Sequence, residues 1–210
     1  MTFRIPTRFR SIAPVALTML ACLGLLAACG GEKPHDPGLI RAPEFTEASG
    51  RLARAWQFAH HASSDSYLLS VDDGAASIER VGHEPWARLA QEIDRQRLSE
   101  VAGRRMAFSM DLRADLDDSV YGKPIEPTGL MARVWQKPAA GSSMVSAMVG
   151  SPRSRDKRLG LAPDAQIPQW ERRSVEFSVP ENVSRIEVSA ILSTGGKLEL
   201  RNPSLRVIDE

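Results

Sequence analysis

Apolar and polar residues alternate along much of this 210-residue chain, and this period of two limits the fold more than any other sequence feature. In Arg105–Arg113 the apolar side chains fall on one side of an extended chain, and the polar or small ones fall on the other. The same alternation predicts strands over Leu130–Gln136, Ser174–Val179 and Arg185–Leu192, and shorter ones over Tyr67–Val71, Ala76–Arg80, Trp86–Ile93, Met144–Val149, Lys197–Leu200 and Leu205–Ile208. About ten short strands with Gly and Pro between them predict an all-β chain that folds as an antiparallel β-sandwich.

The segments between these strands are less regular. Residues 86–100 also have Leu89, Ile93 and Leu98 near helical spacing, and we interpret only the first half of the segment as a strand. An acidic stretch, 114–129, and a basic one, 150–168, lack the alternation and are expected to be loops.

Single residues also suggest local structure. Pro180 is expected to end a strand, because proline cannot donate to the ladder, and Gly195-Gly196 fits a tight hairpin turn. Trp86 and Trp170 are interpreted as residues that open strands and pack at the rim of the sandwich.

The N-terminal segment has the pattern of an export signal. Arg4, Arg8 and Arg10 precede an apolar run over 12–28 that is too short and interrupted for a comfortable membrane span, although an uncleaved anchor is the alternative. Leu26-Ala27-Ala28-Cys29 resembles the lipobox of bacterial lipoproteins. The resemblance implies cleavage after Ala28, lipidation of Cys29 and insertion of its acyl chains into a bilayer. Because Gly30 rather than Asp follows the cysteine, the resemblance favours an outer-membrane location in the cell envelope.

This organisation gives three parts: a signal peptide over 1–28, a lipidated cysteine with a flexible tether over 29–44, and one domain over 45–210. Loss of the signal removes three of 27 basic residues and none of 26 acidic ones. The nearly neutral remainder argues against a nucleic-acid-binding protein, which is usually basic. With Cys22 removed and Cys29 lipidated, no thiol is left for a disulfide, catalysis or a metal site.

The order of several short segments resembles the galactose-binding-like jelly roll, a β-sandwich found in many carbohydrate-binding modules. The resemblance covers most of residues 50–209 and rests on Ser66–Asp72, Gly74–Ile78, Trp86–Ile93, Gly103–Arg113, Trp170–Arg173, Phe177–Pro180, Gly195–Leu200 and Asn202–Val207. It implies a non-catalytic module that binds carbohydrate. Members of the family often hold a structural calcium before the last strand, where this chain has Arg201 and Asn202. Asn202 could offer an oxygen ligand, but Arg201 would repel a cation, so no cofactor is assigned.

The alternation also suggests a binding surface. If Val134 and Phe108 face the core, then Arg133 and Trp135 face outward, and so do Asp111 and Arg113. Sugars are bound by flat aromatic faces with planar polar side chains around them. We therefore predict a surface of Trp135, Arg133, Asp111 and Arg113, with Tyr121 of the acidic stretch as a lid. The competing interpretation is a solvated sheet face on which a loop covers Trp135.

Other candidate sites are weaker. His60-His61 point to opposite faces if they lie on a strand, His83-Glu84 is a similar pair, and Asp115, Asp117 and Asp118 lack the glycine and closing glutamate of a calcium loop. The sequence contains no Gly-x-Ser-x-Gly, His-Glu-x-x-His or phosphate-loop motif. The leading hypothesis is a membrane-anchored carbohydrate-binding module. An assembly lipoprotein that docks another envelope protein is the alternative, and a glycan-acting enzyme is third.

Overall fold

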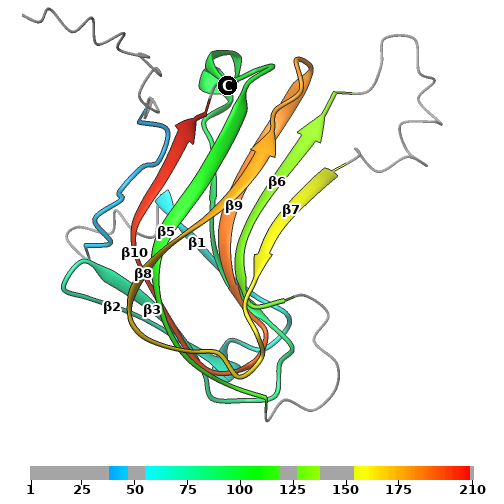
Figure 1. Cartoon of the computed structure of the whole chain (residues 1–210). Coiled ribbons are helices and arrows are strands. Elements are labelled where there is room, and N and C mark those ends of the chain that lie inside the picture. The colour runs from blue at the N-terminus through cyan, green and yellow to red at the C-terminus, as the bar shows by residue number, and fades with distance from the viewer. Residues whose placement is uncertain (1–37, 47–54, 119–126, 138–153, 209–210) are drawn as a thin grey trace, which may run out of the picture. The chain divides into compact units, whose positions relative to one another are not determined.

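The chain folds into two antiparallel five-stranded sheets that face each other, as a computed structural model shows (Figure 1). The structure describes residues 38–46, 55–118, 127–137 and 154–208. The first sheet, called the β10 sheet, has the order β2 (Tyr67–Asp72), β3 (Ala75–Arg80), β10 (Gly195–Val207), β5 (Arg105–Asp117), β8 (Gln166–Ser178). The second, called the β9 sheet, has the order β1 (Gln57–His60), β4 (Ala87–Glu92), β9 (Val183–Leu192), β6 (Gly129–Gln136), β7 (Ser154–Gly160). The predicted all-β sandwich is therefore confirmed.

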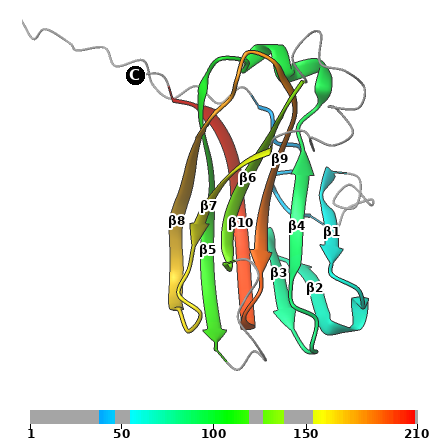
Figure 2. The same cartoon turned by 90° about the vertical axis from the view of Figure 1, so that its right-hand side faces the viewer.

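The core lies between the two sheets, whose strands Figure 2 shows from a second side. It consists of the inward side chains of the alternating strands. Strands β5 and β10 supply Phe108, Met110 and Leu200, and β9 supplies Ile186 and Val188, all of them fully buried. Each such side chain contributes roughly 1.5–3 kcal/mol when it leaves water. The alternation predicted from the sequence thus places the correct face of each central strand in the core.

Both predicted loops contain strand residues. Strand β5 continues to Asp117, so Ala114 and Leu116 point into the core while Asp115 and Asp117 lie on the outer face. The basic stretch contains β7 and the start of β8. Strand β7 is an edge strand with the sequence SRDKRLG, and its charged side chains hide the period of two. The predicted strand over Met144–Val149 lies outside the described residues.

The ambiguous segment contains both kinds of structure. Strand β4 ends at Glu92, and the 3₁₀ helix η3 (Arg95–Glu100) follows. The Asp94 carboxylate caps this helix by accepting a hydrogen bond of 3.0 Å from the backbone N–H of Gln96. A second 3₁₀ turn, η2 (Ser64–Ser66), precedes β2.

The last two predicted strands are one strand, β10, with a β-bulge between Arg201 and Ser204. Asn202 in the bulge has φ +50°. Gly195 and Gly196 do not form the turn that the sequence suggested, because both already pair with β5. Strand β8 ends at Ser178, two residues before Pro180, as expected.

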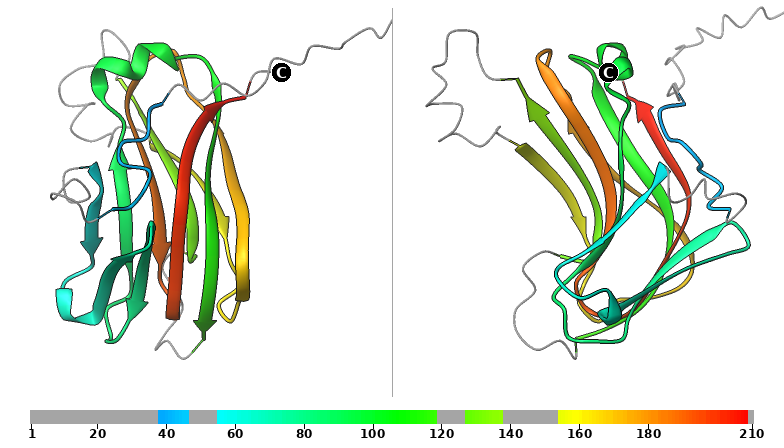
Figure 3. Two further views of the ribbon diagram at one scale, coloured as in Figure 1. Left: turned by 90° about the vertical axis from the view of Figure 1, so that its left-hand side faces the viewer. Right: turned by 180° about the vertical axis from the view of Figure 1, so that it is seen from behind.

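The domain begins before residue 45, where the sequence analysis placed the end of a flexible tether. Leu39 and Phe45 are buried, and the Phe45 ring lies 5.2 Å from that of Trp56, whose Nε1 donates to the carbonyl of Ala42. Figure 3 shows this segment, 38–46, running beside β10. Within the described residues, no helix is long and apolar enough to span a bilayer.

Candidate functional site

The outer face of the β9 sheet carries an aromatic side chain set among arginines. On β6, Val134 points into the core and Arg133 and Trp135 point outward, as predicted. The Arg185 guanidinium lies 4.3 Å from the centre of the Trp135 ring, and that of Arg133 lies 5.7 Å from it. These cation–π contacts hold the partly exposed indole in place on the sheet.

A buried carboxylate fixes two of the surrounding arginines. Glu187 of β9 is only 4% exposed, and its two carboxylate oxygens accept hydrogen bonds from Arg88 at 2.7 Å and from Arg185 at 2.9 Å. On the neighbouring strands, Arg133 donates two hydrogen bonds to Asp156, of 3.1 and 3.2 Å. Because these guanidinium groups are already held, a ligand would meet donors whose directions are fixed.

A second tryptophan lies at the other end of the same face. The Arg88 guanidinium is 5.9 Å from the centre of the Trp86 ring, and His61 meets that ring edge-on at 6.2 Å. His61 Nδ1 lies 2.7 Å from Glu84, and this hydrogen bond is the main reason why the pKa of Glu84 is lowered. A hollow of about 150 Å³ on this face is lined by Trp86, Arg88, Arg133 and Ile191. We call this surface the two-tryptophan face: Trp86, Arg88, Arg133, Trp135, Arg185 and Glu187.

The floor of this face is made of small or apolar side chains. Ala90, Ser189 and Met131 are register partners across β4, β9 and β6, and all three point outward. The hydroxyl of Ser189 is fully buried and has no hydrogen-bond partner among the described residues. A buried hydroxyl without a partner is uncommon in a folded protein, and this one lies beneath the surface of the face rather than open to solvent.

The predicted surface of Trp135, Arg133, Asp111 and Arg113 does not exist as one site. Asp111 and Arg113 do point outward, but they lie on β5 in the β10 sheet, so they face the opposite side of the sandwich. The alternation revealed which side of each strand faces out, but not which sheet each strand joins. Tyr121 lies outside the described residues.

The surroundings of Asn202 do not fit a calcium ion. The side-chain amide of Asn202 donates a hydrogen bond of 2.8 Å to Asp111. The backbone carbonyl of Asn202 accepts one of 2.6 Å from Arg172. Asp111 also faces the guanidinium groups of Arg172 and Arg201. Although partial burial raises the pKa of Asp111, these hydrogen bonds and charges lower it overall. Two guanidinium groups already supply the positive charge that an ion would bring.

The histidines do not form a metal centre in the part of the chain that the structure describes. His60 lies on β1 near Phe58, whereas His61 turns toward Glu84 and Trp86. The described ranges contain no group of three or more His, Cys, Asp or Glu placed to hold one ion.

Four residues of the two-tryptophan face were missing from the predicted site: Trp86, Arg88, Arg185 and Glu187. Trp86 was assigned to rim packing but is partly exposed, with a cation at its ring. The other three alternate with core residues on β4 and β9, which is a signal that the sequence does contain. Their meeting depends on the pairing of β4 with β9, two strands about a hundred residues apart, which periodicity does not reveal.

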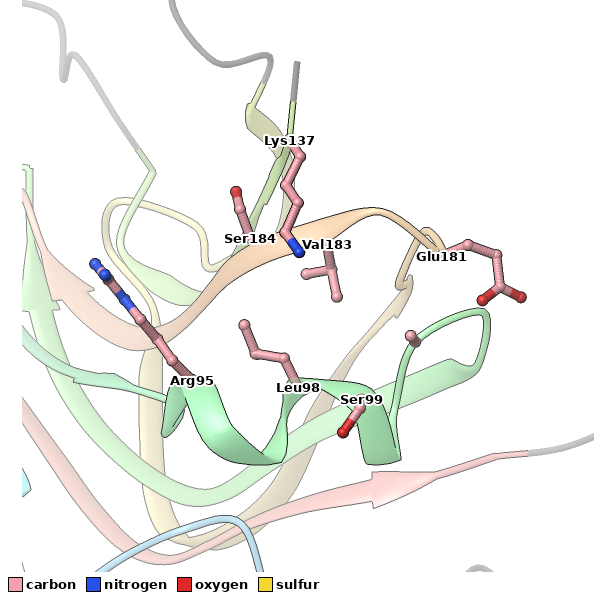
Figure 4. Close-up of a pocket in the computed structure, with 8 residues that line it drawn as sticks. Arg95, Leu98, Ser99, Lys137, Glu181, Val183 and Ser184 are labelled. Carbon is pink, nitrogen blue, oxygen red and sulfur yellow. The ribbon is translucent and has the colours of Figure 1, made fainter. Parts of the chain in front are cut away.

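Another cavity, of about 560 Å³, lies away from this face, between η3 and the start of β9. Figure 4 shows Leu98 and Val183 pointing toward each other, with Arg95 and Glu181 at opposite ends of the cavity. No aromatic side chain lies among its described lining residues. This cavity therefore lacks the feature that distinguishes the two-tryptophan face.

No family model and no curated protein matches the sequence. The structure is similar to carbohydrate-binding modules. One, described as "CBM4 structure and function", is 13% identical over 80% of this chain and 99% of its own, with a TM-score of 0.45. The C-terminal family 22 module of Clostridium thermocellum Xyn10B is 14% identical over 87% of this chain and 98% of its own, also with a TM-score of 0.45.

The chain is also similar to the enzymatically active domain of bacteriophage CBA120 tailspike protein 4, at 13% identity and a TM-score of 0.46. The similar region covers 80% of this chain but only 22% of the tailspike chain. These are similarities of fold at low identity. They assign no ligand, which has to be inferred from the side chains themselves.

Proposed function

We propose that this protein is a non-catalytic glycan-binding module and that the glycan lies across the two-tryptophan face. The observation that carries the proposal is the pair of tryptophans, Trp86 and Trp135, at the two ends of one sheet face with hydrogen-bonded arginines between them. The apolar face of a pyranose ring packs on an indole, while its hydroxyls need donors and acceptors in fixed directions. Arg88 and Arg133 supply the donors, and Glu187 and Asp156 hold them.

The arrangement of charges supports binding rather than hydrolysis. A glycosidase needs two carboxyl groups that are free to exchange protons on either side of the scissile bond. The carboxylates that pair with the arginines of this face, Glu92, Glu187 and Asp156, are instead engaged by guanidinium groups. They act as fixed structural groups that orient the arginines.

A test is to screen the full-length chain, purified in detergent, on a glycan array and to titrate the best ligand against Trp135→Ala. We expect roughly a ten-fold or greater loss of affinity, because a buried aromatic contact is worth about 1–2 kcal/mol. Trp135→Phe should keep most of the affinity, since it retains an aromatic face. Leu68→Ala, an exposed residue of the other sheet, serves as the control. Unchanged affinity in Trp135→Ala would show that this face is not the site.

A docking role is the second candidate, and one observation favours it. Leu68 and Val81 are 54% and 52% exposed, and Leu68 lies on the edge strand β2. An exposed apolar edge strand can pair with another chain. A blank array from folded protein, together with crosslinking from β2 to an envelope protein, would support this role over glycan binding.

We also propose that the module is held at a bilayer by lipidated Cys29. The support is the lipobox-like Leu26-Ala27-Ala28-Cys29 after an apolar run. Several acyl chains on one residue give firm anchoring, since each buried CH₂ adds about 0.8 kcal/mol. Gly30 after the cysteine favours the outer membrane of the cell envelope as the location that we propose.

A further inference from the structure

We propose a second glycan-binding site, on the outer face of the β10 sheet, in a groove beside Trp170. The groove has a volume of about 370 Å³, within the range of small-molecule sites. Trp170 forms part of its lining together with Arg113 and Arg201. The sequence analysis placed this tryptophan at the rim of the core, but it lies within β8 on the outer face and is partly exposed. We call this the Trp170 groove.

Differences in side-chain size across neighbouring strands create the groove. Ser70 of β2 and Ser77 of β3 are register partners, and Ser77 in turn faces Glu199 of β10. In the next row, Ala75 faces Arg201. Small side chains on β2 and β3 thus lie next to long ones on β10, and this difference in length leaves a hollow in the sheet face over β2 and β3. The two serine hydroxyls, 2.7 Å apart, line the hollow as a hydrogen-bonded pair.

Two arginines hold the indole that forms the wall. The guanidinium of Arg201 lies 4.3 Å from the centre of the Trp170 ring, and that of Arg113 lies 5.0 Å from it. Arg113 also donates two hydrogen bonds to Glu199, of 2.5 and 2.9 Å. These hydrogen bonds are the main reason why the pKa of Glu199 is lowered. Ring, cation and carboxylate are therefore set in place before any ligand arrives.

A register shift between β5 and β8 and a bulge in β10 set the directions of the side chains around Trp170. Opposite Trp170, the pairing of β5 with β8 shifts between Leu112 and Ala114. On β10 the bulge after Arg201 is held by hydrogen bonds from Arg172 to Asp111, to the carbonyl of Asn202 and to the hydroxyl of Ser204. Bulges of this kind redirect side chains and are frequent next to functional sites.

The charges of the groove select a neutral ligand. Its described lining has three cations (Arg113, Lys197, Arg201) and three carboxylates (Asp72, Asp73, Glu199), so the formal charges cancel. A polyanion would be repelled by Asp72 and Asp73 at one end, and a polycation by the arginines at the other. Planar donors, carboxylate acceptors and hydroxyls around an aromatic wall suit the hydroxyls of a neutral pyranose.

This inference shares its ligand class with the proposed function but does not depend on the two-tryptophan face. The two surfaces belong to different sheets and point away from each other across the core. One ligand ring cannot touch Trp135 and Trp170 together. Loss of either site therefore leaves the other intact, and each can be tested separately.

The test follows the indole N–H signals of the four tryptophans by NMR in the full-length chain, purified in detergent micelles. The probes are neutral xylo-, cello-, manno- and galacto-hexasaccharides, with an oligogalacturonate as the anionic comparison. We expect at least one neutral probe to shift the Trp170 signal, which Trp170→Phe identifies. Ala75→Trp, which puts a bulky side chain into the groove, should weaken that binding at least ten-fold, whereas the matched Ala75→Ser should keep it.

The outcomes separate the two sites. A Trp170 shift that persists in Trp135→Ala supports the groove even if the two-tryptophan face binds nothing. If no neutral probe moves the Trp170 signal, if oligogalacturonate alone moves it, or if Ala75→Trp leaves the shift unchanged, the proposed groove site is wrong. Shifts of the Trp86 or Trp135 signal alone would support only the first site.

Discussion

Tyr67 shows how one residue connects the core to a loop near the two-tryptophan face. Its ring is buried and lies 5.8 Å from the Arg80 guanidinium, while its hydroxyl donates a hydrogen bond of 2.9 Å to the carbonyl of Glu84. Glu84 in turn contacts His61. Burial is the main cause that raises the pKa of Tyr67 to about 12, because the phenolate would lose its water.

This pKa predicts a specific alkaline weakness. The folded protein holds the phenolic proton more tightly than the unfolded chain, whose tyrosine pKa is about 10. The contribution to stability is therefore complete below about pH 10 and is lost as the pH rises toward 12. Ultraviolet titration should show one late phenolate, and Tyr67→Phe should remove it while costing about 1 kcal/mol at neutral pH. Titration of both tyrosines near pH 10 would contradict the burial argument.

Strand β10 depends on a glycine where it enters the sheet. Gly196 has φ +85°, and a Cβ there would lie 2.1 Å from the backbone carbonyl oxygen of Asp115 on β5. Both the conformation and the close approach exclude a side chain. Since β10 lies in the middle of its sheet, the entry of this strand positions Glu199 and Arg201 as well.

We expect Gly196→Ala to lower the free energy of unfolding by more than about 1 kcal/mol, measured by urea denaturation. Gly38→Ala is the matched control. Gly38 also has a positive φ, of +63°, but a Cβ there meets nothing within 4 Å. The difference between the two variants isolates the contact with Asp115. Equal losses would mean that backbone strain alone accounts for the effect.

The alternation of apolar and polar residues predicted strands correctly where one face of the strand is apolar, and it failed where neither face is. Strands β5 and β6 were found, with the outward positions of Arg133 and Trp135. Edge strand β7 was taken for a loop because its side chains are mostly charged. Trp170 was misplaced because β8 begins at Gln166, earlier than its apolar alternation suggests.

The composition of each site could not be predicted for a different reason. Arg88 and Glu187 meet only because β4 pairs with β9, and Asp111 is separated from Trp135 only because β5 joins the other sheet. Such pairings join residues far apart in sequence. They are decided by the packing of the whole sandwich rather than by any local pattern.

For the whole molecule, the proposed anchor predicts a clear difference between two cysteines. Cells that express Cys29→Ser should lose incorporation of labelled fatty acid, and the module should leave the membrane fraction. Cys22→Ser is the control, because this residue lies in the part expected to be cleaved, and labelling should persist. Retention of Cys29→Ser in the membrane without label would point to an uncleaved N-terminal anchor instead.

The packing of segment 38–46 gives the molecule a mechanical property. A pull from the N-terminal side reaches the domain at Gly38, before any strand. The first contacts to bear the load are the hydrogen bond of 2.8 Å from Arg97 to the Gly38 carbonyl and the buried Leu39. The two hydrogen bonds between the Arg41 backbone and the Gln91 side chain, and the buried Phe45, come next. Tension on the proposed membrane tether would first peel this short segment away and would load the ladders of the two sheets only afterwards.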